Sequence, residues 1–476
     1  MIPERLQPLV TELGGLAERF SASGHRLYLV GGVVRDAVLG RLAPDGDLDF
    51  TTDATPDEIE AIVVGWADAV WTQGKRFGTI GMRKNGMAGG SGGGGSGGGD
   101  RVLEITTHRA EMYHPDSRKP DVVFADAVET DLSRRDFTVN AMALSLPDLT
   151  LIDPFDGVGD LGAGRLRTPL SPDESFGDDP LRMMRAARFI AAYDLTPEPE
   201  LVDAIVRLRG RLEIVSDERI RDELDKLVVV ERPGAGLWFL VRTGLAEEFL
   251  PELPAMALEQ DPIHRHKDVL AHTIAVVEKT SVDRLLRLAA LFHDVGKPKT
   301  RSFGPGGTVS FHHHEVVGAR MTRDRMRALR YSTEDVEIVT RLVELHLRFH
   351  TYRMGWTDSA VRRYVRDAGP LLERLNELTR CDCTTRNEAK ARSLARRMDE
   401  LQERIAELEA SEELAAIRPD LDGRAVMARL GIGPGPAVGE ALAFLLELRL
   451  EEGPLDEEEA GRRLDTWWEA RNPGSS

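Results

Sequence analysis

The sequence has few of the features that mark secreted or membrane proteins. Its 476 residues include only two cysteines, Cys381 and Cys383. Cysteines this close in sequence seldom form a structural disulfide, and two thiolates alone do not complete a zinc site. No apolar run is long enough to span a bilayer, and the N-terminal residues lack the basic start and apolar core of a signal peptide. We therefore expect a protein of the reducing cytoplasm.

An excess of positive charge is also missing, because the formal net charge at pH 7 is −18. Such a charge argues against indiscriminate nucleic-acid binding. It leaves room for one defined RNA partner, since a local basic face is sufficient for binding. Arginine is indeed concentrated in a few segments, at residues 182–188, 205–211, 320–330, 341–366 and 386–397.

The stretch from Leu27 to Phe50 combines a glycine turn with two neighbouring carboxylates. A short β-prone run ends at Gly31-Gly32, and a short helix is predicted to follow. A second strand begins at Asp47, and Asp47 and Asp49 share one face of it because strand side chains alternate. Glycines let backbone N–H groups approach phosphate oxygens, and Mg²⁺ usually binds through one or two carboxylates plus substrate phosphates. The stretch therefore predicts a site for a divalent cation that carries phosphates.

Two further strands, Phe77–Arg83 and Arg101–Thr107, are predicted to form a hairpin. A Gly/Ser-rich segment of flexible composition, residues 88–99, separates them. Glu104 on the second strand is either a solvent-facing side chain or a third carboxylate that faces the aspartate pair. The following residues 110–122 are polar, contain two prolines and predict a mobile loop.

Two strings farther along carry arginines beside acids. Arg134-Arg135-Asp136 is predicted to lie just before an amphipathic helix, and such a cluster is by itself usually a set of surface ion pairs. In residues 177–189 the pattern predicts a mostly buried helix, with Arg182, Arg185 and Arg188 within an arc of roughly 120°. Arginines on a buried helix need anionic partners, because an unpaired buried charge is costly. The partners are either internal acids or a bound triphosphate and base edge.

Together these strings resemble the class II branch of the nucleotidyltransferase superfamily, which contains bacterial CCA-adding enzymes and poly(A) polymerases. The resemblance implies that Asp47 and Asp49 hold two Mg²⁺ ions, with Glu104 as a further catalytic carboxylate. It also implies two groups of nucleotide-binding residues. Gly32, Arg35 and Arg135 would contact the triphosphate, Asp179 and Arg182 would read the base edge of CTP or ATP, and Arg185 and Arg188 would hold phosphates or brace the site. This sequence has Asp178-Asp179 where the family commonly has Glu-Asp.

Nine of the twelve histidines lie between His264 and His350. The pair His293-Asp294, embedded in an apolar helical pattern, resembles the HD phosphohydrolase superfamily. That resemblance implies a second metal site built from His272, His293 and Asp294, with contributions from His314, His346 and Asp382. In relatives this region either hydrolyses phosphoesters with a divalent metal or serves only as a scaffold.

Over most of its length the sequence resembles CCA tRNA nucleotidyltransferases of the actinobacterial type. This implies an α+β fold. The expected parts are a polymerase-β-like head with a small mixed sheet (1–165), a helical neck (166–250), an HD-type helical domain (251–400) and a helical tail that binds tRNA (401–476). The implied reaction adds CCA to the 3′ end of tRNA from CTP and ATP and releases pyrophosphate. Alternatives are a poly(A) polymerase, an enzyme that adds only A or only CC, and an HD phosphohydrolase. No membrane or DNA partner is expected.

Overall fold

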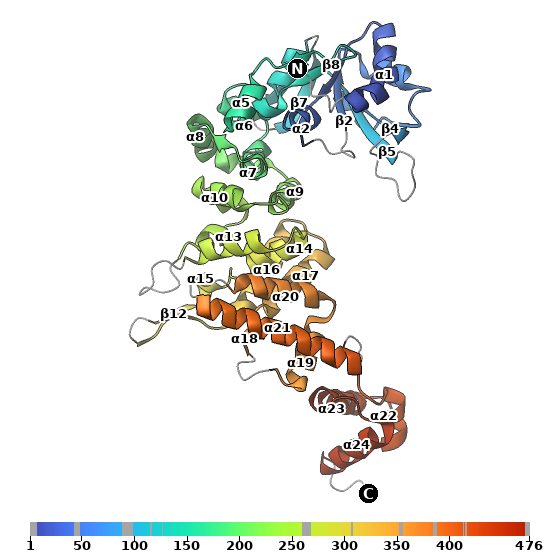
Figure 1. Cartoon of the computed structure of the whole chain (residues 1–476), viewed down its shortest axis with the longest axis vertical. Helices are drawn as coiled ribbons and strands as arrows, with labels where there is room; N and C mark the ends of the chain where they lie inside the picture. The colour runs from blue at the N-terminus through green and yellow to red at the C-terminus, as the bar shows by residue number, and fades with distance from the viewer. Residues whose placement is uncertain are drawn as a thin grey trace. The chain divides into compact units, whose positions relative to one another are not determined.

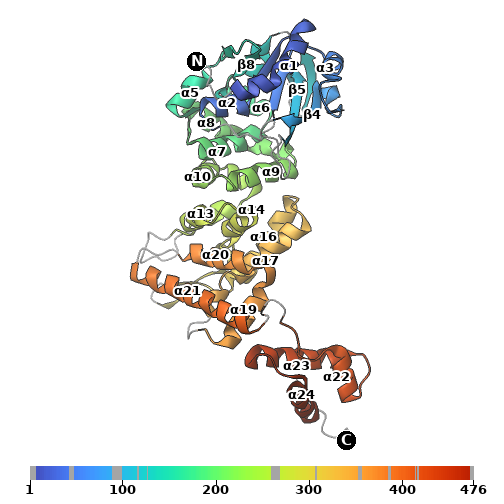
Figure 2. The ribbon, with the colours of Figure 1, turned by 45° about the vertical axis from the view of Figure 1, so that its right-hand side comes forward.

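The structure is a computed structural model that describes residues 7–41, 48–87, 99–114, 117–125, 127–258, 268–305, 308–351, 356–383, 388–412, 414 and 417–471. The chain forms two compact units, residues 1–254 and 255–476. The first unit contains a sheet with helices, and the second consists mainly of helices (Figures 1 and 2). No helix within the described ranges is long and apolar enough to cross a membrane.

The first unit is built on a mixed sheet. Its strands are β1 (Leu27–Val30), β2 (Leu48–Thr52), β3 (Ala69–Trp71), β4 (Thr79–Met87), β5 (Gly99–Thr107), β8 (Ala143–Leu146) and β9 (Leu151–Ile152). In the described residues the strand order is β3-β4-β5-β2-β1-β8-β9. The pair β2–β5 is parallel and the other neighbours are antiparallel. The predicted hairpin of β4 and β5 and the predicted mixed sheet are therefore both present.

Helices complete the first unit. They include α1 (Gln7–Ala22), α2 (Gly32–Val38), α3 (Pro56–Val63), α4 (Val128–Ser133), α5 (Gly157–Ala163), α6 (Pro172–Asp178), α7 (Leu181–Tyr193), α8 (Pro199–Leu208), α9 (Asp217–Val228), α10 (Gly234–Arg242) and α11 (Leu245–Phe249). The core lies between the sheet and helices such as α1 and α3, with Phe20, Phe50 and Ile59 fully buried. On β2, Leu48 and Phe50 are buried while Asp49 is exposed. The strand thus turns its acid away from the core, as alternation predicts.

Two local predictions are wrong. Residues 110–114 and 117–122 are not a loop, because they belong to a two-stranded ribbon of β6 (Arg109–His114) and β7 (Ser117–Phe124). A two-stranded ribbon consists of edge strands, where a proline such as Pro120 is tolerated although it donates no hydrogen bond. The residues after Asp136 also do not form an amphipathic helix. They make one short turn, Thr138–Asn140, and then enter β8. Asp136 accepts hydrogen bonds from the Phe137 N–H and the Asn140 amide, which compete with a helical backbone.

The second unit consists of α13 (Val269–Lys279), α14 (Arg284–Phe292), α15 (Lys297–Thr300), α16 (His314–Ala328), α17 (Thr333–Leu345), α18 (Arg348–Thr351), α19 (Asp358–Ala368), α20 (Leu372–Asp382), α21 (Glu388–Ser411), α22 (Gly423–Leu430), α23 (Pro436–Glu452) and α24 (Glu457–Arg471). A small ribbon of β12 (Arg301–Phe303) and β13 (Val309–Phe311) precedes α16. The last three helices share their own apolar cluster, which includes Val426, Leu445 and Leu464.

Helix α10 packs so closely against α7 that Gly236 has no room for a side chain. A Cβ there would collide with the carbonyl oxygen of Ala187 and lie 2.6 Å from Leu227 Cδ1. We expect Gly236→Ala to lower the free energy of unfolding by about 1–3 kcal/mol, because overpacking displaces neighbouring atoms. Urea denaturation measures this change. Gly210→Ala is the matched control, since its Cβ would meet no described atom within 4 Å. Equal losses in the two variants would contradict the packing explanation.

Candidate active site and candidate metal centre

Asp49 and Glu104 lie side by side on the sheet of the first unit. They are register partners in the parallel pair β2–β5, so their side chains project from the same face. Both side chains are exposed. Glu104, the predicted third carboxylate, is therefore adjacent to Asp49. Its catalytic role stays a prediction. Asp47, the other predicted metal ligand, lies outside the described residues.

The turn between β1 and α2 lies against this acid. Gly31 has φ +78°, and a Cβ there would lie 3.2 Å from Arg135 Nη1 and 3.6 Å from Asp49 Oδ2. A side chain at this position would strain the backbone and crowd both groups. Gly32, the predicted nucleotide contact, faces Arg35 instead: its Cβ would lie 3.3 Å from Arg35 Nη2. The glycine nearest the acid is thus Gly31.

A buried carboxylate fixes the two arginines of the Arg-Arg-Asp string. Asp131 is completely buried and accepts hydrogen bonds from Arg134 Nη2 at 2.9 Å and Arg135 Nη2 at 3.2 Å. Burial raises the pKa of Asp131, but the charges of Arg134 and Arg135 outweigh burial and hold this pKa at about 2. Asp131 is therefore ionised at neutral pH. We did not single it out from the sequence, although its spacing of three and four residues from the arginines was a usable signal.

A second buried carboxylate joins the same string to helix α7. Asp136 Oδ2 accepts from Arg185 Nε at 2.8 Å and Nη2 at 2.6 Å. Burial raises the pKa of Asp136, but Arg185 and the Asn140 amide bring it down to about 2. One turn along α7, Arg188 Nε donates to Glu223 of α9 at 2.8 Å. Internal acids, one of the two alternatives left open by the sequence, thus neutralise Arg185 and Arg188.

Asp179 and Arg182 meet at the junction of α6 and α7. Asp179 Oδ1 accepts from the Leu181 N–H at 3.1 Å, at the first residue of α7. Its Oδ2 accepts from Arg219 Nη2 of α9 at 2.8 Å. Arg182 is buried, and its Nη1 donates to Ser175 Oγ at 2.9 Å. Arg219 is a second residue that we did not predict, because nothing in its own helix pattern distinguishes it from a surface arginine.

These groups surround one cleft of about 340 Å³ in the first unit. Its lining consists of Val30, Asp49, Phe50, Thr106, Arg109, Arg134, Arg135, Asp136, Asp179, Leu181, Arg182, Arg185 and Arg219. Five predicted site residues therefore meet there: Asp49, Arg135, Asp179, Arg182 and Arg185. One acid near the glycine turn thus faces a set of guanidinium groups and a second acid, an arrangement that can hold a metal, phosphates and a polar base edge together.

Among the described residues, Arg35 and Arg188 do not line this cleft. Arg35 is 6% exposed, and its guanidinium donates to Asp36 Oδ1 at 2.8 Å and to Asn140 Oδ1 at 2.6 Å. It also lies over the ring of Tyr193, 4.2 Å from the centroid. These contacts tie α2 to α7 and to the turn that carries Asn140.

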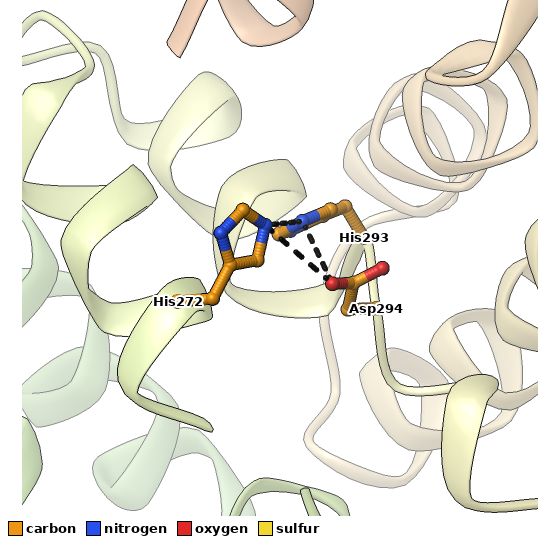
Figure 3. Close-up of side chains that lie close together, drawn as sticks. All are labelled: His272, His293 and Asp294. Atoms are coloured by element: carbon orange, nitrogen blue, oxygen red, sulfur yellow. Dashed lines mark hydrogen bonds and ion pairs between the residues drawn. The ribbon is translucent and has the colours of Figure 1, made fainter. Parts of the chain in front are cut away.

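The histidines of the second unit form a separate cluster at the ends of helices. His272 is on α13, His293 and Asp294 follow α14, His314 begins α16, His346 follows α17, and Asp382 ends α20. Figure 3 shows His272 and His293 directed toward one oxygen of Asp294. That oxygen lies 3.6 Å from His272 Nε2 and 3.3 Å from His293 Nε2. The other oxygen of Asp294 lies 3.4 Å from His314 Nε2. All three predicted residues of the second metal site are thus brought together.

The chemistry of this cluster fits a divalent metal. Two ligand groups, His272/His293/Asp294 and Asp294/His314/His346, share Asp294, and in each the ligand atoms lie within 4.8 Å of one another. The Nε2 atoms of His314 and His346 are buried without a hydrogen-bond partner among the described residues. Burial lowers the pKa of His346 to about 3, so its imidazole is neutral, the form that binds metals. Imidazole and carboxylate ligands suit Mn²⁺, Ni²⁺, Fe²⁺ or Zn²⁺.

Family models match three parts of the chain. The model described as "Poly A polymerase head domain" matches residues 27–167, and "Probable RNA and SrmB- binding site of polymerase A" matches residues 194–256. "HD domain" matches residues 269–387. The head and HD matches imply dependence on divalent metals.

Curated relatives and solved structures agree with these matches. The A-adding tRNA nucleotidyltransferase of Deinococcus radiodurans is 36% identical over 362 residues, which cover 73% of this chain and 81% of the relative. The CCA-adding enzyme of Bacillus subtilis is 37% identical over 227 residues, 48% of this chain and 52% of that relative, so the match spans about half of it. The Bacillus stearothermophilus CCA-adding enzyme, solved in complex with CTP, has the same fold, with a TM-score of 0.67, 22% identity and 99% coverage of both chains.

The arrangement of head, helical segment and HD domain agrees with the resemblance that the sequence motifs carry. The identity and coverage of the Deinococcus radiodurans relative extend that agreement over most of the chain. The chain therefore belongs to the family of tRNA nucleotidyltransferases and poly(A) polymerases.

Proposed function

We propose that this protein adds CCA to the 3′ end of tRNA without a template, using CTP and ATP and releasing pyrophosphate. The observation that carries the proposal is the cleft of the first unit. There Asp49, beside Glu104, faces Arg135, Asp179 and Arg182. The family and the relatives named as CCA-adding enzymes support the same reaction.

The acidic pair is the proposed metal site. Asp49 on β2, together with Asp47 just before it, would hold two Mg²⁺ ions, since Mg²⁺ favours carboxylate and phosphate oxygens. Bound there, Mg²⁺ would activate the tRNA 3′-hydroxyl and support the departing pyrophosphate. Glu104 would accept the proton of the hydroxyl as the hydroxyl oxygen bonds to the α-phosphorus of the nucleotide.

Protein side chains replace a template in this proposal. Asp179 can accept a hydrogen bond from the amino group of C or A, and Arg182 can donate to ring acceptors. G and U carry a carbonyl where C and A carry that amino group, so both would be rejected. Arg219 donates a hydrogen bond to Oδ2 of Asp179, and this bond fixes the orientation of the Asp179 carboxylate.

The remaining arginines divide into two roles. Arg135, with Nη1 close to Gly31, would bind the triphosphate, together with Gly32 of the same turn. Arg185 and Arg188 brace the site through Asp136 and Glu223, and Arg35 braces it through Asn140.

The proposal also divides the chain into four parts, with boundaries at residues 165, 250 and 400, and assigns tRNA binding to the last part. The two free cysteines support a cytoplasmic location.

A-only addition is the second candidate for the head. The relative that is aligned over most of its length, from Deinococcus radiodurans, is an A-adding tRNA nucleotidyltransferase. The same acids and arginines would serve either reaction, because both transfer a nucleotide to a tRNA 3′-hydroxyl.

The histidine cluster supports a further activity, hydrolysis of phosphoesters in the second unit. His272, His293, Asp294, His314, His346 and Asp382 would hold the metal, which would activate water for attack on phosphorus. Lys297 Nζ lies 2.7 Å from Asp294 Oδ2 and would offset negative charge beside the metal ligands.

The head reaction is tested on labelled tRNA that lacks its 3′ CCA. With CTP and ATP together we expect extension by three nucleotides, and with CTP alone by two. Asp49→Asn should reduce the rate more than about 100-fold, since even partners of metal ligands typically contribute 10–100-fold. Asp148→Asn, an exposed acid in a turn, is the matched control and should be fully active. Extension only of tRNA that ends in CC, by one A, would establish the second candidate. No extension under any condition would refute both.

Base selection is tested by Asp179→Ala. We expect the ratio of kcat/KM for CTP to that for UTP to fall at least about tenfold, the worth of a hydrogen bond of roughly 1.4 kcal/mol. The KM for pyrophosphate in the reverse reaction should change little, because Asp179 reads the base. Asp173→Ala, on the exposed first turn of α6, is the control. Unchanged selectivity among the four nucleotides would remove Asp179 from the base-reading role.

The second site is tested by metal binding as well as by activity. We expect the wild-type chain to bind Mn²⁺ or Ni²⁺ in equilibrium dialysis and to hydrolyse p-nitrophenyl phosphate. His272→Ala should lower both, because it removes a ligand. His313→Ala, an exposed histidine next to the cluster, should change neither. Metal binding without hydrolysis would indicate a structural metal, and absence of both would leave the second unit as a scaffold.

A further inference from the structure

Helix α16 carries three arginines that the proposed reactions do not use. Arg320, Arg323 and Arg327, here called the arginine stripe, are all exposed. At about 100° per residue they fall within an arc of about 60° on one side of the helix. Ala319, Thr322 and Met326 are buried on the adjacent side of the helix, about 40° or more from the stripe. In Figure 2 the helix lies beside α17 in the second unit.

The stripe shares its part of α16 with one exposed acid, Asp324, and acids are abundant elsewhere in the chain. The chain has 80 acidic residues and 62 lysines and arginines, and other arginines of the second unit form ion pairs with these acids. Arg284 pairs with Asp335 at 2.8 Å and Arg341 with Glu344 at 2.8 Å. Within the described ranges, Arg320, Arg323 and Arg327 form no ion pair. Three positive charges therefore point together into solvent on a protein whose net charge is −18.

The geometry of the stripe suits a phosphate chain. With a rise of 1.5 Å per residue, Arg320 and Arg327 are about 10 Å apart along the helix, which corresponds to about three nucleotides of a strand at roughly 3.4 Å each. Each guanidinium can donate two parallel hydrogen bonds to one phosphate. The helix is also held in place at its first residue, because His314 is buried and its Nε2 lies 3.4 Å from Asp294 Oδ1. The row of charges is therefore presented on a fixed support.

We propose that the arginine stripe binds the sugar-phosphate backbone of the tRNA substrate. This inference rests on the proposed function, in which an enzyme of net negative charge binds one polyanion, tRNA. The contacts would be independent of sequence, since they reach phosphates and not base edges. The stripe thus gives the HD-containing unit a part in holding tRNA that does not depend on whether its metal site hydrolyses anything.

The test compares the full chain with the triple variant R320Q/R323Q/R327Q. Binding of tRNA lacking CCA is measured by fluorescence anisotropy at several salt concentrations. We expect Kd at about 0.1 M salt to rise at least tenfold, and the slope of log Kd against log salt to become shallower by about two to three, because three phosphate contacts are lost. The KM for tRNA should rise while the KM for CTP stays unchanged. R320K/R323K/R327K retains the charges and should keep most of the affinity.

A matched control removes the same charge from paired arginines. R26Q/R83Q/R207Q alters exposed arginines that face Asp53, Asp100 and Asp173. An equal loss of affinity in this control would mean that net charge alone matters and would overturn the stripe. Unchanged Kd and salt slope in R320Q/R323Q/R327Q would also overturn it, while CCA addition by the wild type would leave the proposed function standing. A wild type that neither binds nor extends tRNA would refute both.

Discussion

Buried carboxylates that neutralise arginines are the constraint on which the head depends. Asp131, Asp136 and Glu223 are each almost wholly enclosed, and each holds at least one guanidinium group. A free arginine side chain loses about 2 kcal/mol of rotamer entropy when it is fixed. Here the internal acids fix the arginines during folding, so a nucleotide would meet donors that are already in position. Electrostatic stabilisation is most effective when its groups do not have to reorganise.

The same network explains what the sequence could and could not predict. Local patterns predicted β1, the glycine turn, the exposed side of β2 and helix α7, because alternation and helical spacing depend on neighbouring residues. They also gave the residue types of the cleft. They could not give the pairs, since Arg185 and Asp136 are 49 residues apart, Arg219 and Asp179 are 40, and Arg188 and Glu223 are 35. Arg219 acquires its importance only when the fold brings α9 next to Asp179, whereas the pairs of Asp131 lie within four residues of it.

Both wrong predictions arose where a local signal had a competitor. The two prolines of residues 110–122 indicated a loop, yet Pro120 lies in a two-stranded ribbon, where an edge position tolerates the missing donor. After Asp136, apolar residues at helical spacing indicated a helix, yet the carboxylate binds the Phe137 N–H and the Asn140 amide. Phe137 is consequently extended and fully buried. In this second case the competing acid is itself a part of the arginine network.

The histidine cluster shows how helix ends prepare a metal site. His293, His314 and His346 each direct Nδ1 to the carbonyl oxygen three residues earlier, in Ala290, Phe311 and Val343. A carbonyl can only accept, so Nδ1 must carry the proton, and in the neutral ring Nε2 keeps its lone pair. The last carbonyls of α14 and α17 have no partner within their helices, which makes them available for this bond. Unsatisfied helix ends thus select the tautomer of His293 and His346, the last residue of β13 does the same for His314, and the three histidines lie around Asp294.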